Sequence, residues 1–224
     1  KENKTMSEAI ISLKNVTKKF KDAVVLNDVS AEFLPGMIHG IVGRNGCGKT
    51  IMFKCILNFM RATDGEIFVR GKQVKKDYIP QNIGTIIESP GFLPNYSGYK
   101  NLSLLAQING KIGKAEIKNA LCAVGLDPDS KKHVKKYSMG MRQRLGIAQA
   151  IMEEPDILIL DEPFNGLDNT GVQDMRKLFS DLRAGGKTIL LTSHNSEDID
   201  RLCDYVYEMD KGHIKNIENR TVAK

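Results

Sequence analysis

The 224-residue sequence contains no tryptophan, and aromatic residues make up only 6% of it. It has no apolar run that approaches the roughly 20 residues of a membrane-spanning helix. Its first ten residues, KENKTMSEAI, lack the apolar core of a signal peptide. We therefore expect a chain that is soluble by itself. Because a plausible start occurs at Met6, we also expect the first residues to be an extension, and no functional argument rests on them.

Cysteine is scarce, and its spacing shows no pairing. The four cysteines, Cys47, Cys55, Cys122 and Cys203, lie far apart, so neither a disulfide framework nor a zinc site is indicated. This pattern is typical of a reducing compartment. The sequence also lacks internal repeats, low-complexity linkers and sustained heptads, which excludes solenoids and long coiled coils.

The apolar share of 41% supports a folded core, and 224 residues suit one α/β domain or a compact domain with an inserted subdomain. Lysine and arginine number 33 against 27 aspartates and glutamates, a formal net charge of +6. That balance suits an anionic membrane surface, nucleic acid or a nucleotide as partner, and equally a solvated basic face without a partner.

Two kinds of strand are predicted. Three segments alternate between apolar and polar residues and favour antiparallel strands: residues 9–16, 24–33 and 65–70. Four short, continuous apolar runs favour the buried strands of a parallel sheet: residues 37–42, 83–87, 156–160 and 188–192.

The strand signal disappears between Pro90 and Glu154. Helical patterns replace it around residues 98–109, 114–124 and 139–153. This change of period predicts a helical subdomain inserted between two strands of the sheet.

The run GRNGCGKT follows the apolar strand ending at Val42 and precedes a helical stretch, IMFKCILNFM. It matches the phosphate-binding loop G-x-x-x-x-G-K-[ST] in the required strand–loop–helix context, which disfavours an accidental glycine-rich turn. Lys49 would lie between the β- and γ-phosphates, and the Thr50 hydroxyl would ligate Mg²⁺. The predicted nucleotide-binding residues are Gly43, Arg44, Asn45, Gly46, Cys47, Gly48, Lys49 and Thr50.

Two further strands end in polar side chains. Asp161 and Glu162 follow the apolar run DILIL, at the sheet edge where parallel strands bind ligands. Asp161 fits the Walker B acid of the Mg²⁺ shell, and Glu162 is placed to orient or deprotonate the attacking water. His194 follows TILLTS and would donate to the γ-phosphate. The expected catalytic residues are thus Glu162, His194 and Lys49, whereas His39, His133 and His213 favour core or surface roles.

The stretch YSMGMRQRL, residues 137–145, reads as the start of a helix that could hold an anion. Ser138 is a good N-cap, and Gly140 allows close backbone approach. By itself the stretch is more typical of an ordinary capped helix. Nothing in it could hold a nucleotide alone.

Together these motifs resemble the ATP-binding cassette family, the nucleotide-binding subunits of ABC transporters. The resemblance implies that YSMGM is the signature motif, whose Ser138 and Gly140 face ATP held by the phosphate loop of a second subunit. It identifies residues 165–168, NGLD, as the D-loop and His194 as the switch histidine. Phe20 falls where the family places an aromatic residue that stacks on adenine.

Three positions depart from the family pattern. Met139 and Met141 stand where the usual signature has Gly and Gln, but we expect binding across the dimer to survive. After the strand at 83–87 most members have a glutamine that touches Mg²⁺ and relays nucleotide state to the membrane partner. Here that position is Glu88, and Gln81 precedes the strand and is a poorer candidate for the role of the glutamine. The added negative charge predicts slower or more Mg²⁺-sensitive hydrolysis, with Thr50, Glu88 and Asp161 near the metal.

The resemblance covers nearly the whole chain and implies a single ABC ATPase domain, residues 1–224, of the α/β class. Residues 1–88 and 155–224 would form a RecA-like P-loop NTPase core, with a mixed, mainly parallel sheet and an antiparallel β subdomain. Residues 89–154 would form the helical subdomain that carries the signature. Expected partners are ATP, Mg²⁺, a second cassette bound head to tail, and a separate transmembrane permease that holds the chain at the cytoplasmic face of a bacterial membrane.

Glu88, YSMGMRQRL and IIESPGFLP together resemble the ATPases of bacitracin- and lantibiotic-type peptide exporters or immunity systems. One alternative is a soluble cassette ATPase that acts on DNA or ribosomes, which the basic run KKHVKK at 131–136 would suit. Because such runs are usually solvated, no nucleic-acid partner is expected. Another alternative is a nucleotide-gated regulator without useful turnover, which the intact Glu162 disfavours.

Overall fold

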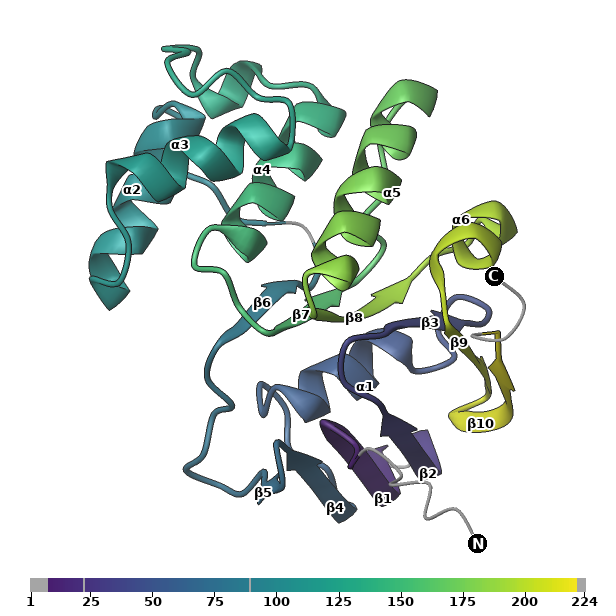
Figure 1. Ribbon diagram of the computed structural model, residues 1–224. Coiled ribbons are helices and arrows are strands. Elements are labelled where there is room, and N and C mark those ends of the chain that lie inside the picture. The colour runs from purple at the N-terminus through teal and green to yellow at the C-terminus, as the bar shows by residue number, and fades with distance from the viewer. Residues whose placement is uncertain (1–7, 22, 89, 221–224) are drawn as a thin grey trace, which may run out of the picture.

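The computed structural model describes residues 8–21, 23–88 and 90–220, so the expected extension at the first residues lies outside the described residues. Two sheets organise the chain (Figure 1). The smaller sheet is antiparallel, in the order β2-β1-β4-β5, and the larger has the order β10-β9-β3-β8-β7-β6. Five strands of the larger sheet run parallel, and only β10 is antiparallel to its neighbour β9.

The strands have the following bounds: β1 Ile11–Phe20, β2 Ala23–Phe33, β3 Ile38–Val42, β4 Asp64–Val69, β5 Lys72–Gln73, β6 Ile83–Ile86, β7 Ile157–Leu160, β8 Thr188–Thr192, β9 Tyr205–Asp210 and β10 His213–Asn219. The helices are α1 Lys49–Ile56, α2 Gly98–Asn109, α3 Lys114–Ala123, α4 Met139–Ile151, α5 Asn169–Ala184 and α6 Ser196–Leu202, with a 3₁₀ turn at Val134–Lys136. This mixed architecture confirms the predicted α/β class.

The larger sheet has a core on each face. Strand β8, TILLT, is buried throughout, because its successive side chains point to opposite faces and both faces are covered. Ile189 and Leu191 lie in one cluster with Phe179 of α5, and Leu190 lies in the other with Phe53 of α1. Helix α1 is therefore held between the two sheets, while α5 covers the opposite face (Figure 1).

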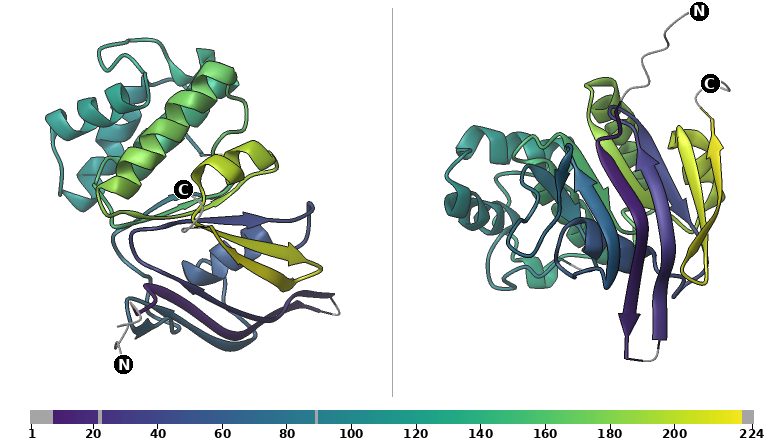
Figure 2. Two further views of the ribbon diagram at one scale, coloured as in Figure 1. Left: turned by 45° about the vertical axis from the view of Figure 1, so that its right-hand side comes forward. Right: turned by 90° about the horizontal axis from the view of Figure 1, so that it is seen from below.

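Helices α2, α3 and α4 form a group beside β6, on the side away from the β9–β10 hairpin (Figure 2). The three helices follow β6 and precede β7 in the chain, as the loss of strand signal after Pro90 predicts. Their own core includes Leu102 of α2, Leu121 of α3 and Leu145 of α4, all buried. Within the described residues, no helix combines the length and the apolar character that crossing a bilayer requires.

The sequence patterns missed three strands, β5, β9 and β10. β5 has only two residues. β10 is largely exposed at the sheet edge, so it lacks the strong apolar alternation of a half-buried strand. Of the three, only β9 carries a strand signal, the aromatic and β-branched run YVY.

Candidate nucleotide site

Three polar segments meet at one edge of the larger sheet. The glycine-rich loop follows β3, Asp161 follows β7 and His194 follows β8. These strands are neighbours in the order β3-β8-β7 and run parallel, so their carboxyl ends open onto the same crevice. A cavity of about 240 Å³ lies there, bordered by the loop residues 45–51 and by Asp161, Glu162 and His194.

The loop takes a shape that its glycines permit. Gly43 has φ 154°, and a Cβ atom on it would lie 2.2 Å from the Met209 carbonyl oxygen. Gly46 has φ 78°, and a Cβ there would meet nothing within 4 Å, so the backbone is open to a ligand at this point. The loop therefore fits a group that approaches the backbone closely, as a phosphate does.

Lys49 begins α1 and is buried, with 7% of its surface exposed. Its Nζ donates to the Gly43 carbonyl at 2.7 Å and lies 3.3 Å from that of Arg44. The loop thus curls around the ammonium group and fixes it at the floor of the cavity. Among the described residues, the hydrogen-bond partners of this buried cation are carbonyl oxygens, which leaves its positive charge available for an anionic ligand.

Asp161 is held by two hydroxyl donors. Thr50 Oγ1 donates to one carboxylate oxygen at 2.6 Å, and Thr192 Oγ1 donates to the other at 2.8 Å. The Thr192 hydroxyl also accepts from the Glu162 backbone N–H at 2.7 Å. Thr192 was missed by the sequence analysis; it is the last residue of β8 and lies next to the end of β7, so the strand order is the signal that would have found it.

Glu162 carries an oxygen without a hydrogen-bond partner. The Glu162 backbone has φ 51°, and the Glu162 side chain is 19% exposed. Oε1 lies 2.9 Å from His194 Nε2, in a geometry that leaves this buried oxygen without a hydrogen bond. Burial raises the pKa of Glu162, against the opposing fields of His194 and Lys49. A partly buried carboxylate that borders the cavity and has a raised pKa is suited to accept a proton from a water molecule.

A network behind His194 fixes the loop on which it stands. Ser193 Oγ donates to Asp198 at 2.8 Å, and Arg176 Nε donates to the same carboxylate at 2.9 Å. Asn195 caps α6 by accepting from the Glu197 backbone N–H at 2.9 Å. The imidazole, about half exposed, is thereby presented to the cavity from an anchored turn.

Ser138 and Gly140 lie apart from this cavity, at the start of α4. Ser138 is the N-cap and accepts from the Met141 backbone N–H at 3.2 Å. A Cβ on Gly140 would lie 2.8 Å from the carbonyl oxygen of Gly166, in the predicted D-loop. Neither Ser138 nor Gly140 borders the cavity of its own chain.

Phe20 and Glu88 also lie outside the border of the cavity. Phe20 ends β1, is 41% exposed and has Lys18 Nζ 4.9 Å from its ring centroid. Glu88 follows β6 and pairs with Lys54 of α1, with Oε1 and Nζ 2.6 Å apart. Gln81 is exposed, and its side chain donates to the Ile79 carbonyl.

The histidines outside the site have the predicted core and surface placements. His39 is fully buried in β3, whereas His133 and His213 are exposed. His39 Nε2 lies 2.9 Å from the Leu34 carbonyl oxygen. Burial lowers the pKa of His39 to about 4.

The oxygen donors fit Mg²⁺. The cation prefers hard oxygen ligands, takes few of them from the protein and completes its shell with phosphate and water. Thr50 Oγ1 and Asp161 Oδ2, 2.6 Å apart, offer such a pair directly beside the loop. The open backbone at Gly46 leaves room beside this pair for a phosphate.

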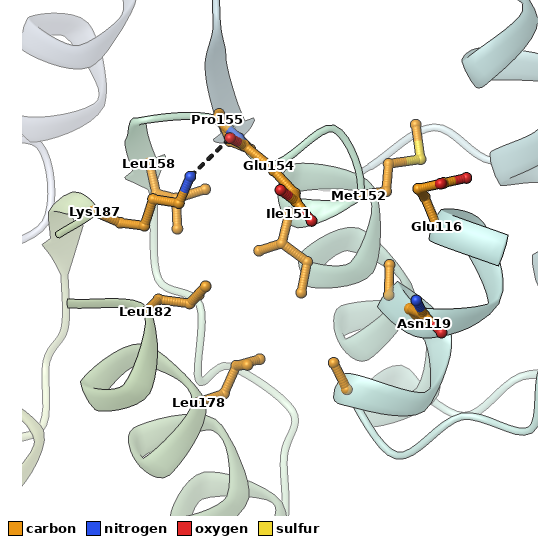
Figure 3. Close-up of a pocket in the computed structure, with 12 residues that line it drawn as sticks. Glu116, Asn119, Ile151, Met152, Glu154, Pro155, Leu158, Leu178, Leu182 and Lys187 are labelled. Atoms are coloured by element: carbon orange, nitrogen blue, oxygen red, sulfur yellow. Dashed lines mark hydrogen bonds between the residues drawn. The ribbon is translucent and has the colours of Figure 1, made fainter. Parts of the chain in front are cut away.

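A separate apolar cavity of about 350 Å³ lies between α3, α4, α5 and the start of β7 (Figure 3). Leu158, Leu178 and Leu182 point into it, and Lys187 donates to the Glu154 carbonyl at its rim at 2.8 Å. No predicted site residue lines it. The glycine-rich loop, Asp161, Glu162 and His194 lie instead at the sheet edge, so the fold and that edge are those of a P-loop ATPase.

Comparison with known proteins identifies the family. The ABC transporter family model matches residues 26–165. The chain is 40% identical to the bacitracin transport ATP-binding protein BcrA of Enterococcus faecalis, over 92% of this chain and 68% of that protein. It is 33% identical to the lantibiotic transport ATP-binding protein SrtF of Streptococcus pyogenes, over 88% of this chain and 85% of that protein.

Among solved structures, the fold matches a dimeric bacterial ABC transporter cassette with a TM-score of 0.84 at 22% identity, over 93% of this chain and 98% of the other. The chain belongs to the ABC transporter family, and it is an ATP-binding and ATP-hydrolysing subunit of a transporter. The resemblance based on the motifs is therefore confirmed.

Proposed function

We propose that this subunit powers the export of an antimicrobial peptide of the bacitracin or lantibiotic kind, or immunity to one. The support comes from two similar proteins, whose names assign them to bacitracin transport and to lantibiotic transport. The same comparisons disfavour a cassette that acts on nucleic acid or ribosomes. Such an activity would appear as stimulation of ATP hydrolysis by DNA or RNA, which this proposal does not expect.

Within one chain, we assign each site residue a role in hydrolysis. The loop from Gly43 to Thr50 binds the phosphates through its backbone N–H groups, and Lys49 neutralises the β- and γ-phosphates. Thr50 and Asp161 would hold Mg²⁺ bound with the nucleotide, and the cation would screen the phosphate charge. Glu162 orients and deprotonates the attacking water, and His194 donates to the γ-phosphate oxygen.

The site of one chain supplies only part of the groups that a γ-phosphate needs. One wall of the cavity carries the loop, the carboxylates and His194, whereas the capped N-terminus of α4 lies elsewhere in the same chain. We propose that a second copy, bound head to tail, brings Ser138 and Gly140 to this phosphate. A helix N-terminus offers backbone N–H groups and a positive dipole end to such an anion.

We propose that a membrane permease docks where the helical group meets the core, near Glu88. A cleft of about 330 Å³ lies between the end of α1, the start of β6 and the ends of α2 and α4, whereas Glu88 follows the other end of β6 and does not line the cleft. Three large apolar side chains around it are exposed: Phe59 at 59%, Ile79 at 53% and Ile108 at 79%. A cluster of this kind marks an interaction surface, and a hydrophobic protein that co-purifies from native membranes would identify the partner.

The contact between Glu162 Oε1 and His194 Nε2, at 2.9 Å, supports the hydrolytic assignment. Replacing the Glu162 carboxylate tests this assignment. We expect Glu162→Gln to bind ATP normally and to hydrolyse it at least about 100-fold more slowly, because the amide cannot accept the proton of the water. ATP binding and steady-state ATPase rates should be measured on the same preparation.

Glu208→Gln is the matched control, because Glu208 is an exposed residue of β9 outside the cavity. It should retain the full rate. If Glu162→Gln hydrolyses ATP as fast as the unmodified chain, Glu162 has no catalytic role.

A further inference from the structure

The end of β6 lies close to the end of β7. The Asp161 backbone N–H donates to the Ile86 carbonyl at 2.7 Å, and Ile86 pairs in register with Leu160. Glu88 is two residues beyond Ile86 and takes a left-handed conformation, with φ 61°. Its backbone therefore turns sharply next to the strand that delivers Asp161.

The Glu88 side chain is directed to α1 and not to the cavity. Its Oε1 lies 2.6 Å from Lys54 Nζ, and Glu88 is not among the residues that border the cavity. Lys54 is four residues beyond Thr50 in the same helix, so the two side chains lie on one face about 6 Å apart along the axis. The Glu88 carboxylate is thus held one helical turn beyond the Thr50 hydroxyl.

Within the described part of the chain, each of these residues has the other as its only ion-pair partner. Glu88 is 66% exposed and Lys54 is 23% exposed. Exposed pairs of this kind contribute little to stability. The pair can therefore break at small cost, and its geometric effect on the carboxylate matters more than its contribution to folding.

The charge of Glu88 matters because a divalent cation attracts every carboxylate that can reach it. Thr50 and Asp161 already form the oxygen pair that fits Mg²⁺. A second carboxylate in that shell would bind the cation more tightly and would repel the phosphates. Whether the Glu88 carboxylate enters the coordination shell of the cation therefore depends on which group holds its side chain.

We propose that Lys54 is the positioning residue of Glu88, and that its ammonium group keeps the Glu88 carboxylate out of the coordination shell of the cation held at Thr50 and Asp161. This inference rests on the proposed nucleotide site. It assigns a role to a residue outside the phosphate loop, the carboxylate pair and the signature motif.

Binding of Mn²⁺, a spectroscopic substitute for Mg²⁺, tests the proposal without measuring turnover. Free Mn²⁺ is titrated by electron paramagnetic resonance into the full chain saturated with ADP. Lys54→Met should tighten Mn²⁺ binding by about threefold or more, because the released carboxylate can reach the cation. Lys54→Arg keeps the charge and the reach, so it should bind Mn²⁺ as the unmodified chain does.

The decisive comparison repeats Lys54→Met together with Glu88→Gln. There the tightening should disappear, because no carboxylate remains to be released. Lys118→Met is the matched control, since Lys118 forms a similar exposed pair with Asp129 at 2.5 Å, on α3. It should leave Mn²⁺ binding unchanged.

Three results overturn the proposal. If Lys54→Met shifts Mn²⁺ binding equally with and without Glu88→Gln, Lys54 acts only through its own charge. If Lys54→Met shifts nothing although Mn²⁺ binding depends on ADP, Lys54 does not position Glu88, while the proposed nucleotide site stands. If Mn²⁺ binding does not depend on ADP at all, the nucleotide site fails as well.

Discussion

At the scale of single residues, Glu162 and Asp161 are adjacent in sequence but differ in environment. Both oxygens of Asp161 accept hydrogen bonds from threonines, whereas one oxygen of Glu162 is buried without such a partner. Burial accordingly raises the pKa of Glu162. Two neighbouring carboxylates in different surroundings can take different tasks, one holding a cation and the other accepting a proton.

His39 makes the stability of the fold sensitive to acid. Its Nε2 lies against the Leu34 carbonyl and its Nδ1 lies 3.3 Å from the Tyr207 hydroxyl, and burial lowers its pKa to about 4. The unfolded chain therefore binds a proton here below about pH 6.5, while the folded chain does not until about pH 4. The free energy of unfolding should fall across this window by up to about 3 kcal/mol.

Urea unfolding at pH 7, 6, 5 and 4.5 checks this expectation. His39→Gln should lose the part of the acid slope that lies between pH 6.5 and 4.5. His133→Gln, which changes an exposed histidine, should keep nearly all of it. Equal slopes for His39→Gln and the unmodified chain would show that acid acts elsewhere.

The sequence predicted those site residues whose position depends on local spacing. Lys49 and Thr50 follow from the loop pattern, and Asp161 and His194 follow from their places after apolar strands. Thr192 and Lys54 were missed because their contacts depend on lateral relations, between β7 and β8 and between α1 and the end of β6. Spacing along one strand carries no information about which strand lies beside it.

At the scale of elements, the helical group joins the core by a close approach of backbones. A Cβ on Gly84 of β6 would lie 1.9 Å from the Ala150 carbonyl oxygen of α4 and 2.7 Å from Leu158 Cδ2 of β7. The last turn of α4 therefore lies directly on β6. Only glycine allows this spacing between a helix and a strand.

Gly84→Ala should destabilise the fold by about 1–3 kcal/mol, because backbone must move to admit the methyl group. The midpoint of denaturant unfolding measures this loss. Gly91→Ala is the control, because a Cβ there would meet nothing within 4 Å. Equal midpoints for Gly84→Ala and Gly91→Ala would contradict the close contact between β6 and α4.

Another contact between elements joins the signature motif to the D-loop. The Cγ of Met139 would lie 2.5 Å from a Cβ on Gly166, and the Gly166 carbonyl faces Gly140. Met139 is nevertheless 67% exposed. The departure from the family pattern at this position thus places an exposed apolar side chain beside the capped helix start.

The sequence predicted strongly patterned elements better than weakly patterned ones. The four buried parallel strands and the three inserted helices lie where the apolar patterns place them. β10 was missed because it is mostly exposed, and its pairing with β9 depends on a hairpin turn at residues 211–212. The alternation of apolar and polar residues shows which side chains are buried. An exposed edge strand has no such alternation and is therefore hard to detect in the sequence.

At the scale of the whole molecule, the proposed nucleotide site requires two copies of the chain. The phosphate loop, Asp161, Glu162 and His194 face one cavity, and Ser138 caps a helix that does not border it. The negative charge of the triphosphate would attract both surfaces, so ATP itself would hold the copies together. Hydrolysis would weaken that attraction and let them separate.

Light scattering during size-exclusion chromatography of Glu162→Gln with saturating ATP and Mg²⁺ tests this claim most directly. The account predicts a particle of twice the chain mass, which returns to the single-chain mass without ATP. Adding Ser138→Arg, which places bulk and charge at the start of α4, should prevent the doubling while the isolated chain still binds ATP. A Glu162→Gln chain that is saturated with ATP and remains at the mass of one copy would contradict the account.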